Sequence, residues 1–165
     1  GENWELGTRD TRSYATLSDV VEYLEWLGEK VESTNNRTKK LTNAAKAIAA
    51  QETSLTELMI NGEDNIKGLK DLEGTEIIGG EKNPNRKGLV SFRIVGSQSQ
   101  EIVDFLNVNG IRTHVRKADH YSGNILNPLG WEDCVRVSVC HYNSSEEIKS
   151  LLLALNEFQL KLPTN

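Results

Sequence analysis

The segment DCVRVSVCHY, residues 133–142, alternates between apolar and polar side chains, which is the period of a β-strand. Its three valines, Val135, Val137 and Val139, are expected to point to one face of a sheet. The other face then carries two cysteines, a serine and Arg136. An arginine in mid-strand is costly to bury alone, so it either lies at solvent or binds an anion. The segment therefore predicts a sheet with one apolar face and a second face that holds Arg136.

The rest of the chain predicts helices first and a sheet afterwards. Residues 1–9 are expected to be extended, and apolar spacing predicts a helix from Thr11 to Leu27 that Gly28 ends. A second helix is expected through Ala44 towards Met59, and a short one to Leu72. Strands are predicted at 75–78, 88–95, 111–116 and 134–141, and helices at 97–109 and 144–158. Residues 119–130 are expected to form a loop with one helical turn.

This order predicts helices over 11–72 and a strand-strand-helix-strand-strand-helix unit over 75–158. Ser144 and Glu147 form a capping box at the start of the last helix. The fold class expected is α/β, an α+β sandwich whose small, mostly antiparallel sheet has helices packed on one face. With 165 residues, the chain is expected to be a single domain over 1–165.

Composition excludes several classes of protein. The net charge of -5 argues against a nucleic-acid surface, and no apolar run approaches the ~18 residues of a membrane span. Two cysteines make no disulfide framework, and the absence of a signal peptide favours the cytoplasm. The chain begins with Gly1 and has its only methionine at Met59, so we expect it to be a fragment of a longer protein.

Metal and nucleophile motifs are weak. His114, His120 and His141 do not have zinc-ligand spacing with the cysteines. Cys134 and Cys140 would lie about 20 Å apart along one strand, beyond the roughly 7 Å that a disulfide allows. Phosphate-loop, H-E-x-x-H and G-x-S-x-G patterns do not occur. By these criteria the chain alone has no complete active site.

Three motifs, in order along the chain, resemble one known family. ELGTRD at residues 5–10 leads into a helix that ends EYLEWLG, GLVSFRI precedes a helix and NGIRTHVRK, and VRVSVCHYNSSEEI closes the chain. Together they resemble the C-terminal small domain of the class V aminotransferase-fold enzymes, which depend on pyridoxal phosphate. The branches most similar are the cysteine desulfurases, selenocysteine lyases and isopenicillin N epimerase-like proteins.

The resemblance implies roles for particular residues. Arg136 matches the strand arginine that binds the substrate carboxylate, a task that suits the planar fork of a guanidinium. Arg112 opens the segment that leads to the active-site loop. His120 and Tyr121 stand where desulfurases carry a histidine and the persulfide-forming cysteine. Thr8 matches a residue that reaches the cofactor phosphate of the other subunit in a homodimer.

The function expected from this resemblance is that of one domain of an enzyme. The parent would use pyridoxal 5'-phosphate on an amino acid, by C-S lyase chemistry or a related β-elimination, with racemisation or transamination as second choice. Its cofactor lysine would lie in a preceding domain, so this chain alone is expected to bind no cofactor and catalyse nothing. Tyr121 replaces the cysteine, so no protein persulfide is expected. The alternative is a ferredoxin-like regulatory module that binds a small ligand without catalysis.

Overall fold

In the computed structural model, residues 10–162 can be described, and they form two compact units. Unit 1 ends at Ala50 and unit 2 begins at Gln51, so the boundary lies inside one helix, α2 (Arg37–Asn61). The extended segment expected over 1–9 lies outside the described residues. The single domain expected over 1–165 stays a prediction. No helix within residues 10–162 is both long enough and apolar enough to cross a membrane.

Unit 1 consists of α1 (Thr11–Val31) and the first half of α2. Asp10 caps α1 by accepting hydrogen bonds from the backbone N–H groups of Arg12 and Ser13. The prediction that Gly28 ends this helix is wrong, since the helix runs three residues further. A Cβ on Gly28 would lie 1.8 Å from the Lys40 carbonyl oxygen, so the glycine allows close approach of α2.

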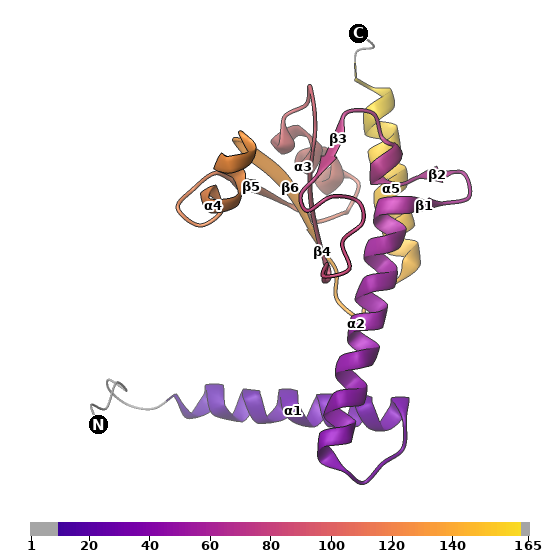
Figure 1. Cartoon of the computed structure of the whole chain (residues 1–165), viewed down its shortest axis with the longest axis vertical. Coiled ribbons are helices and arrows are strands. Elements are labelled where there is room, and N and C mark those ends of the chain that lie inside the picture. The colour runs from indigo at the N-terminus through magenta and orange to yellow at the C-terminus, as the bar shows by residue number, and fades with distance from the viewer. Residues whose placement is uncertain (1–9, 163–165) are drawn as a thin grey trace. The chain divides into compact units, whose positions relative to one another are not determined.

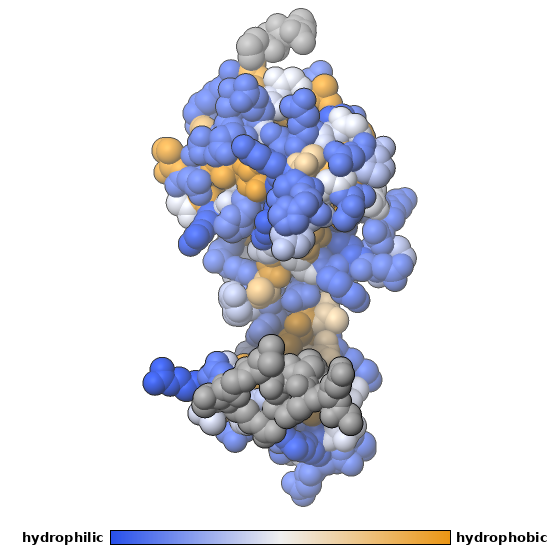
Figure 2. Space-filling view, turned by 90° about the vertical axis from the view of Figure 1, so that its left-hand side faces the viewer, coloured by the Kyte–Doolittle hydropathy of each residue, from blue (hydrophilic) through white to orange (hydrophobic). Residues whose placement is uncertain are grey.

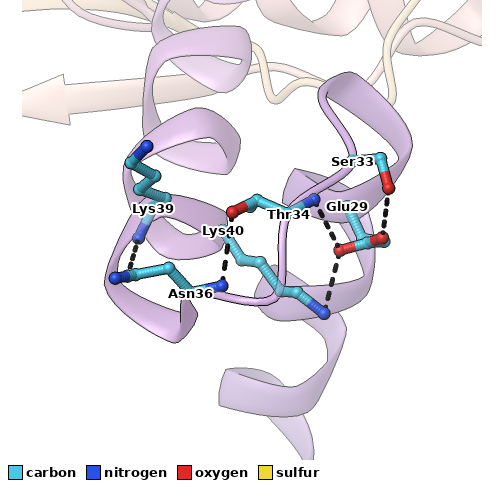
Figure 3. A network of polar contacts seen from close by, with 6 residues as sticks. All are labelled: Glu29, Ser33, Thr34, Asn36, Lys39 and Lys40. Atoms are coloured by element: carbon cyan, nitrogen blue, oxygen red, sulfur yellow. Dashed lines mark hydrogen bonds and ion pairs between the residues drawn. The ribbon is translucent and has the colours of Figure 1, made fainter.

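A polar network closes the turn between these helices (Figure 3). The Glu29 carboxylate accepts from the Lys40 ammonium at 2.9 Å, from the Ser33 hydroxyl at 3.0 Å and from the Thr34 amide at 3.3 Å. Asn36 accepts from the Lys39 amide through its side chain at 3.0 Å, which satisfies an N–H of the first turn of α2. Lys40 thus holds α1 through its ammonium group.

Unit 2 is built on a four-stranded antiparallel sheet in the order β3-β4-β6-β5. The strands are β3 (Thr75–Ile77), β4 (Leu89–Ile94), β5 (His114–Lys117) and β6 (Asp133–Ser138). Helices α3 (Ser99–Val108) and α5 (Ser145–Leu160) lie to one side of it, as Figure 1 shows. The fold class expected from the sequence is confirmed.

The main core lies between the sheet and these helices. Val135, Val137 and Val139 of the quoted segment are all buried there, as their alternation predicts. They pack with side chains of β4, α3 and α5, among them Val90, Phe92, Ile94, Ile102, Leu106, Leu152 and Leu155. Figure 2 shows the mainly hydrophilic surface that surrounds these buried residues.

The second face of the sheet is partly covered by the segment that follows β5. This segment contains the single helical turn α4 (Gly123–Leu126) and the 3-10 turn η2 (Asn127–Leu129), which confirms the turn expected within 119–130. Leu126, Trp131 and Cys134 form a small buried cluster beneath it. A pocket remains open beside this cluster, and Leu126, Cys134 and Arg136 are among the residues that line it.

The short helix expected up to Leu72 is mostly wrong. A hairpin of β1 (Gly62–Glu63) and β2 (Ile66–Lys67) follows α2 instead, and η1 (Leu69–Asp71) is a single 3-10 turn. Gly62 has φ +74 and Asp64 φ 48, and this left-handed backbone breaks the helix. The hairpin is tied to α5, because Lys149 pairs with Glu63 at 2.6 Å and Asn156 donates to the Lys67 carbonyl at 3.0 Å.

Local signals set the other boundaries. The capping box is confirmed: Ser144 Oγ accepts from the Glu147 amide at 3.2 Å, and Glu147 accepts from the Ser144 amide at 2.8 Å. Asn143 holds the preceding turn by accepting from the Cys140 amide at 2.8 Å. β5 begins three residues later than expected and β6 ends at Ser138, although the Val139 amide still bonds to the Gly88 carbonyl at 2.8 Å.

Candidate functional site

A pocket of about 410 Å³ opens on the face of the sheet opposite the main core. Strands β4, β5 and β6 form its floor, and the segment around α4 forms its wall. Its lining residues are Ile78, Leu89, Ser91, Arg116, Asp119, Tyr121, Ser122, Ile125, Leu126, Cys134 and Arg136. One part of the pocket is thus apolar, while the other carries two guanidinium groups.

Arg136 lies in the middle of β6, paired with Ser91 of β4 on one side and with His114 of β5 on the other. The residue is half-buried, and its Nε is buried without a hydrogen-bond partner among residues 10–162. Burial lowers the pKa of the Arg136 guanidinium, and the positive charge of Arg116 lowers it further. A cation in this condition is a strong binding group for an anion.

Arg116 is the second cation of the pocket, and the sequence did not single it out. It pairs with Cys134 in the register of β5 and β6, so its side chain lies on the same face as that of Arg136. The sequence signal that could have found Arg116 is its alternation with His114 on one short strand. The position of this strand beside β6, however, appears only in the structure. Two arginines on adjacent strands form a site for a carboxylate or another small anion.

The wall segment is held by Asp119. Its Oδ1 accepts hydrogen bonds from the amides of Ser122 at 2.8 Å and Tyr121 at 2.9 Å. These bonds lower the pKa of the Asp119 carboxyl below its usual value. Tyr121 therefore stands at the pocket wall with 77% of its surface exposed, and its ring lies tilted against that of His120 with 4.0 Å between centroids.

Both cysteines are free thiols. Cys134 is buried beside Ser91 at the pocket floor, and burial raises the pKa of its thiol, although a hydrogen bond with Ser91 opposes this shift. It therefore remains protonated at neutral pH and is a poor nucleophile. Cys140 lies beyond the end of β6, outside the pocket.

The structure brings together only some of the residues predicted from the sequence. Arg136 and Tyr121 both line the pocket, whereas His120 touches it only through Tyr121. Arg112 is exposed in the coil before β5 and is not a lining residue. Thr8 lies outside the described residues. Within residues 10–162, no group of three or more histidine, cysteine or acidic side chains is arranged to bind a metal ion.

Comparison with known proteins identifies a family and several relatives. Residues 39–151 match the family model described as aminotransferase class V. A probable cysteine desulfurase of Pseudomonas putida is 33% identical over 113 residues, which are 68% of this chain and 25% of that protein. A cysteine desulfurase of Synechococcus elongatus is 29% identical over 156 residues, 94% of this chain and 21% of the relative. The chain thus spans about a quarter of the length of these relatives.

Solved structures show the same fold. The apo cysteine desulfurase of Thermococcus onnurineus superposes with a TM-score of 0.61 at 24% identity, over 76% of this chain and 30% of that one. The cysteine desulfurase CsdA of Escherichia coli gives a TM-score of 0.57 at 21% identity, over 82% and 33%. At these identities the likeness establishes the fold alone.

Proposed function

The chain belongs to the class V aminotransferase family, and on this premise we propose that it is the C-terminal, substrate-binding domain of a pyridoxal-phosphate enzyme that acts on an amino acid. The relatives are cysteine desulfurases, which favours C-S lyase chemistry or a related β-elimination in the parent protein. Racemisation or transamination is the second choice. The domain's own task is to bind and orient the substrate.

The observation that carries this proposal is Arg136, whose Nε is buried without a partner among residues 10–162, beside Arg116. A guanidinium whose Nε is buried without a partner gains most from an anion that supplies the missing acceptor. The α-carboxylate of an amino acid offers two oxygens with the spacing of the guanidinium fork, and Arg116 supplies a second charge from the adjacent strand. The two arginines would fix the carboxylate, while Ile78 and Leu89 exclude water beside it.

Tyr121 and Cys134 support our proposal that this chain carries no persulfide. The tyrosine occupies the wall position at which the resemblance expects the desulfurase cysteine. Cys134 is held as a protonated thiol by burial, and Cys140 lies outside the pocket. We therefore propose that neither of these two cysteines carries a persulfide. Any sulfur removed from a substrate would leave without first binding to this domain.

The cofactor can be fitted to this chain only in part. Two arginines suit an anionic group, but none of the pocket's lining residues is a lysine, which the family needs to hold pyridoxal phosphate covalently. The cofactor, when bound, supplies the electron sink for chemistry at the substrate's α-carbon. We therefore assign the lysine to a preceding domain of the parent. Cytoplasmic location, a homodimeric parent and the role of Thr8 stay predictions.

The regulatory-module alternative has less support. It explains a domain without a complete active site, but the match of residues 39–151 to the enzyme family favours the enzyme. The described pocket also supports this choice, because Arg116 and Arg136, whose Nε has no hydrogen-bond partner among residues 10–162, both lie beside the wall segment.

Kinetics of the full-length parent test the arginine assignment. Arg136→Ala should lower kcat/KM by roughly 30-fold or more, since loss of one partner of a desolvated charge pair costs about 2–5 kcal/mol. Arg116→Ala should act in the same direction. Arg112→Ala is the matched control, because this arginine is exposed outside the pocket, and it should leave kcat/KM nearly unchanged. A larger effect at Arg112 than at Arg116 would reverse the assignment.

The cofactor assignment has a separate test. Treatment of the parent with borohydride fixes pyridoxal phosphate to the lysine that holds it, and mass spectrometry of the peptides locates that lysine. We expect the label on a lysine outside these 165 residues. A label on one of this chain's own lysines would show that the domain holds the cofactor itself, and a parent that takes up no pyridoxal phosphate would end the proposal.

A further inference from the structure

Helix α1 exposes a row of large apolar side chains that residues 10–50, the described part of unit 1, do not cover. Tyr14 is 55% exposed, Leu17 61% and Val20 48%, and these residues follow one another at helical spacing. Trp26 is 55% exposed further along the same helix. Soluble proteins rarely leave such a continuous apolar surface in water unless a partner binds it.

The exposed groups lie on more than one side of the helix. Nine residues separate Leu17 from Trp26, which at 3.6 residues per turn places them roughly 180° apart around the axis. Trp26 stacks on Tyr23 with 5.9 Å between ring centroids, and Tyr23 follows Val20 by three residues, so the exposed row winds around the helix from the Leu17 side to the Trp26 side. A helix that is apolar on opposite sides is typical of one enclosed by other elements.

Unit 1 has almost no core of its own. Among residues 10–50, only Gly28 and Ala44 are buried, and both belong to the crossing of α1 and α2. Two helices that bury so little cannot offset the conformational entropy of ordering them. The stability of α1 must therefore come from apolar burial against something outside unit 1.

We propose that the apolar surface of α1 is the docking surface for the preceding domain of the parent polypeptide. This inference rests on the proposed function, which requires such a domain for the cofactor lysine. The curated relatives quoted above are roughly four to five times as long as the segment they share with this chain, which leaves ample protein to supply it. A domain ahead of Gly1 would be tethered about ten residues from α1, at a high effective concentration.

Two other occupants fit less well. A membrane surface would meet Asp19 and Glu22 on the same helix, and these carboxylates repel anionic lipid. A second copy of this chain, packed helix to helix, would cover the Leu17 side and leave Trp26 exposed. A domain surface that receives α1 in a groove covers both sides, and this is why we favour it.

Hydrogen exchange tests the proposal on the full-length parent and on the 165-residue chain. Amides between Tyr14 and Leu27 should exchange at least about tenfold more slowly in the parent, because docking suppresses local opening of the helix. Leu17→Glu should remove that protection by placing a charge in the interface. Ser18→Glu, the neighbouring residue on the polar side, is the matched control and should leave protection unchanged.

Each outcome has a meaning. Equal exchange of α1 in the parent and in the short chain would overturn the proposal, and so would equal effects of Leu17→Glu and Ser18→Glu. Protection in the short chain that increases with protein concentration would assign the surface to a second copy instead. A parent without a preceding domain would overturn the proposed function as well, and its sequence alone would reveal this. A preceding domain that leaves α1 unprotected would overturn only the docking surface.

Discussion

Replacement of Arg136 by methionine should make the isolated chain more stable. The Arg136 Nε is buried with no hydrogen-bond partner among the described residues, and a buried donor of this kind costs about 1–3 kcal/mol. Arg116 adds like-charge repulsion. Because the residue is only half-buried, we expect the lower end of that range, about 1 kcal/mol. Methionine retains the unbranched stem that packs on the sheet, so little apolar contact is lost.

The assays are urea denaturation and thermal unfolding at neutral pH, each followed by circular dichroism and by tryptophan fluorescence. A gain of about 1 kcal/mol corresponds to a rise in melting temperature of roughly 2–4 °C for a chain of this size. Arg93→Met is the control on the same face, since Arg93 pairs with Glu76 at 2.7 Å and its guanidinium lies 4.4 Å from the centroid of the Trp131 ring. That variant should be no more stable than the wild type.

A stabilised Arg136→Met chain would mean that the arginine is kept at the expense of stability, as binding groups in functional sites often are. Unchanged or lower stability, with the two probes giving coincident curves, would refute this reasoning. Arg136 would then be an ordinary solvated arginine, and the main argument for an anion site would be lost.

The remaining predictions concern unit 1 and the pocket thiol. Gly28→Ala should destabilise the crossing of α1 and α2 by about 1–3 kcal/mol, because the new Cβ would lie 1.8 Å from the Lys40 carbonyl oxygen. This effect should exceed the intrinsic preference of alanine for helices. Hydrogen exchange in both helices should become faster, and slower exchange would contradict the prediction. Hydrogen bonds from Lys40, Ser33 and Thr34 lower the pKa of Glu29, so its stabilising contribution is complete above the ordinary glutamate pKa and is lost as pH falls through the lowered value. Glu29→Gln should therefore make the α1–α2 turn less sensitive to acid, as exchange at several pH values can establish, and equal acid sensitivity would count against the network. Cys134 should react more slowly than Cys140 with iodoacetamide at pH 7.5, because burial raises the pKa of its thiol. Mass spectrometry measures the extent of labelling at each cysteine, and faster labelling of Cys134 would contradict this prediction.

The sequence predicts the sheet well because its signals are local. Alternation in residues 133–142 assigns the valines to the core and Arg136 to the opposite face, and the Ser144 capping box starts α5 where expected. Gly28 was misinterpreted because glycine has two common uses at a helix. Its role here is the close approach of Lys40, and this contact lies twelve residues away in the sequence.

Arg116 illustrates the limit of sequence patterns at the site itself. Its position on a strand was predictable, but its place beside Arg136 follows from the order β4-β6-β5 and from the register that pairs it with Cys134. No local pattern encodes either fact. Arg112, the arginine chosen from the sequence, lies only four residues earlier and is exposed outside the pocket.

The most direct test of the central claim compares an amino-acid substrate with its carboxamide in the full-length parent. If Arg136 binds the carboxylate, the wild type should prefer the acid over the amide by roughly 30-fold or more in kcat/KM, and Arg136→Ala should lose most of that preference. A preference that survives unchanged in Arg136→Ala would contradict the claim that this domain recognises its substrate through that charge.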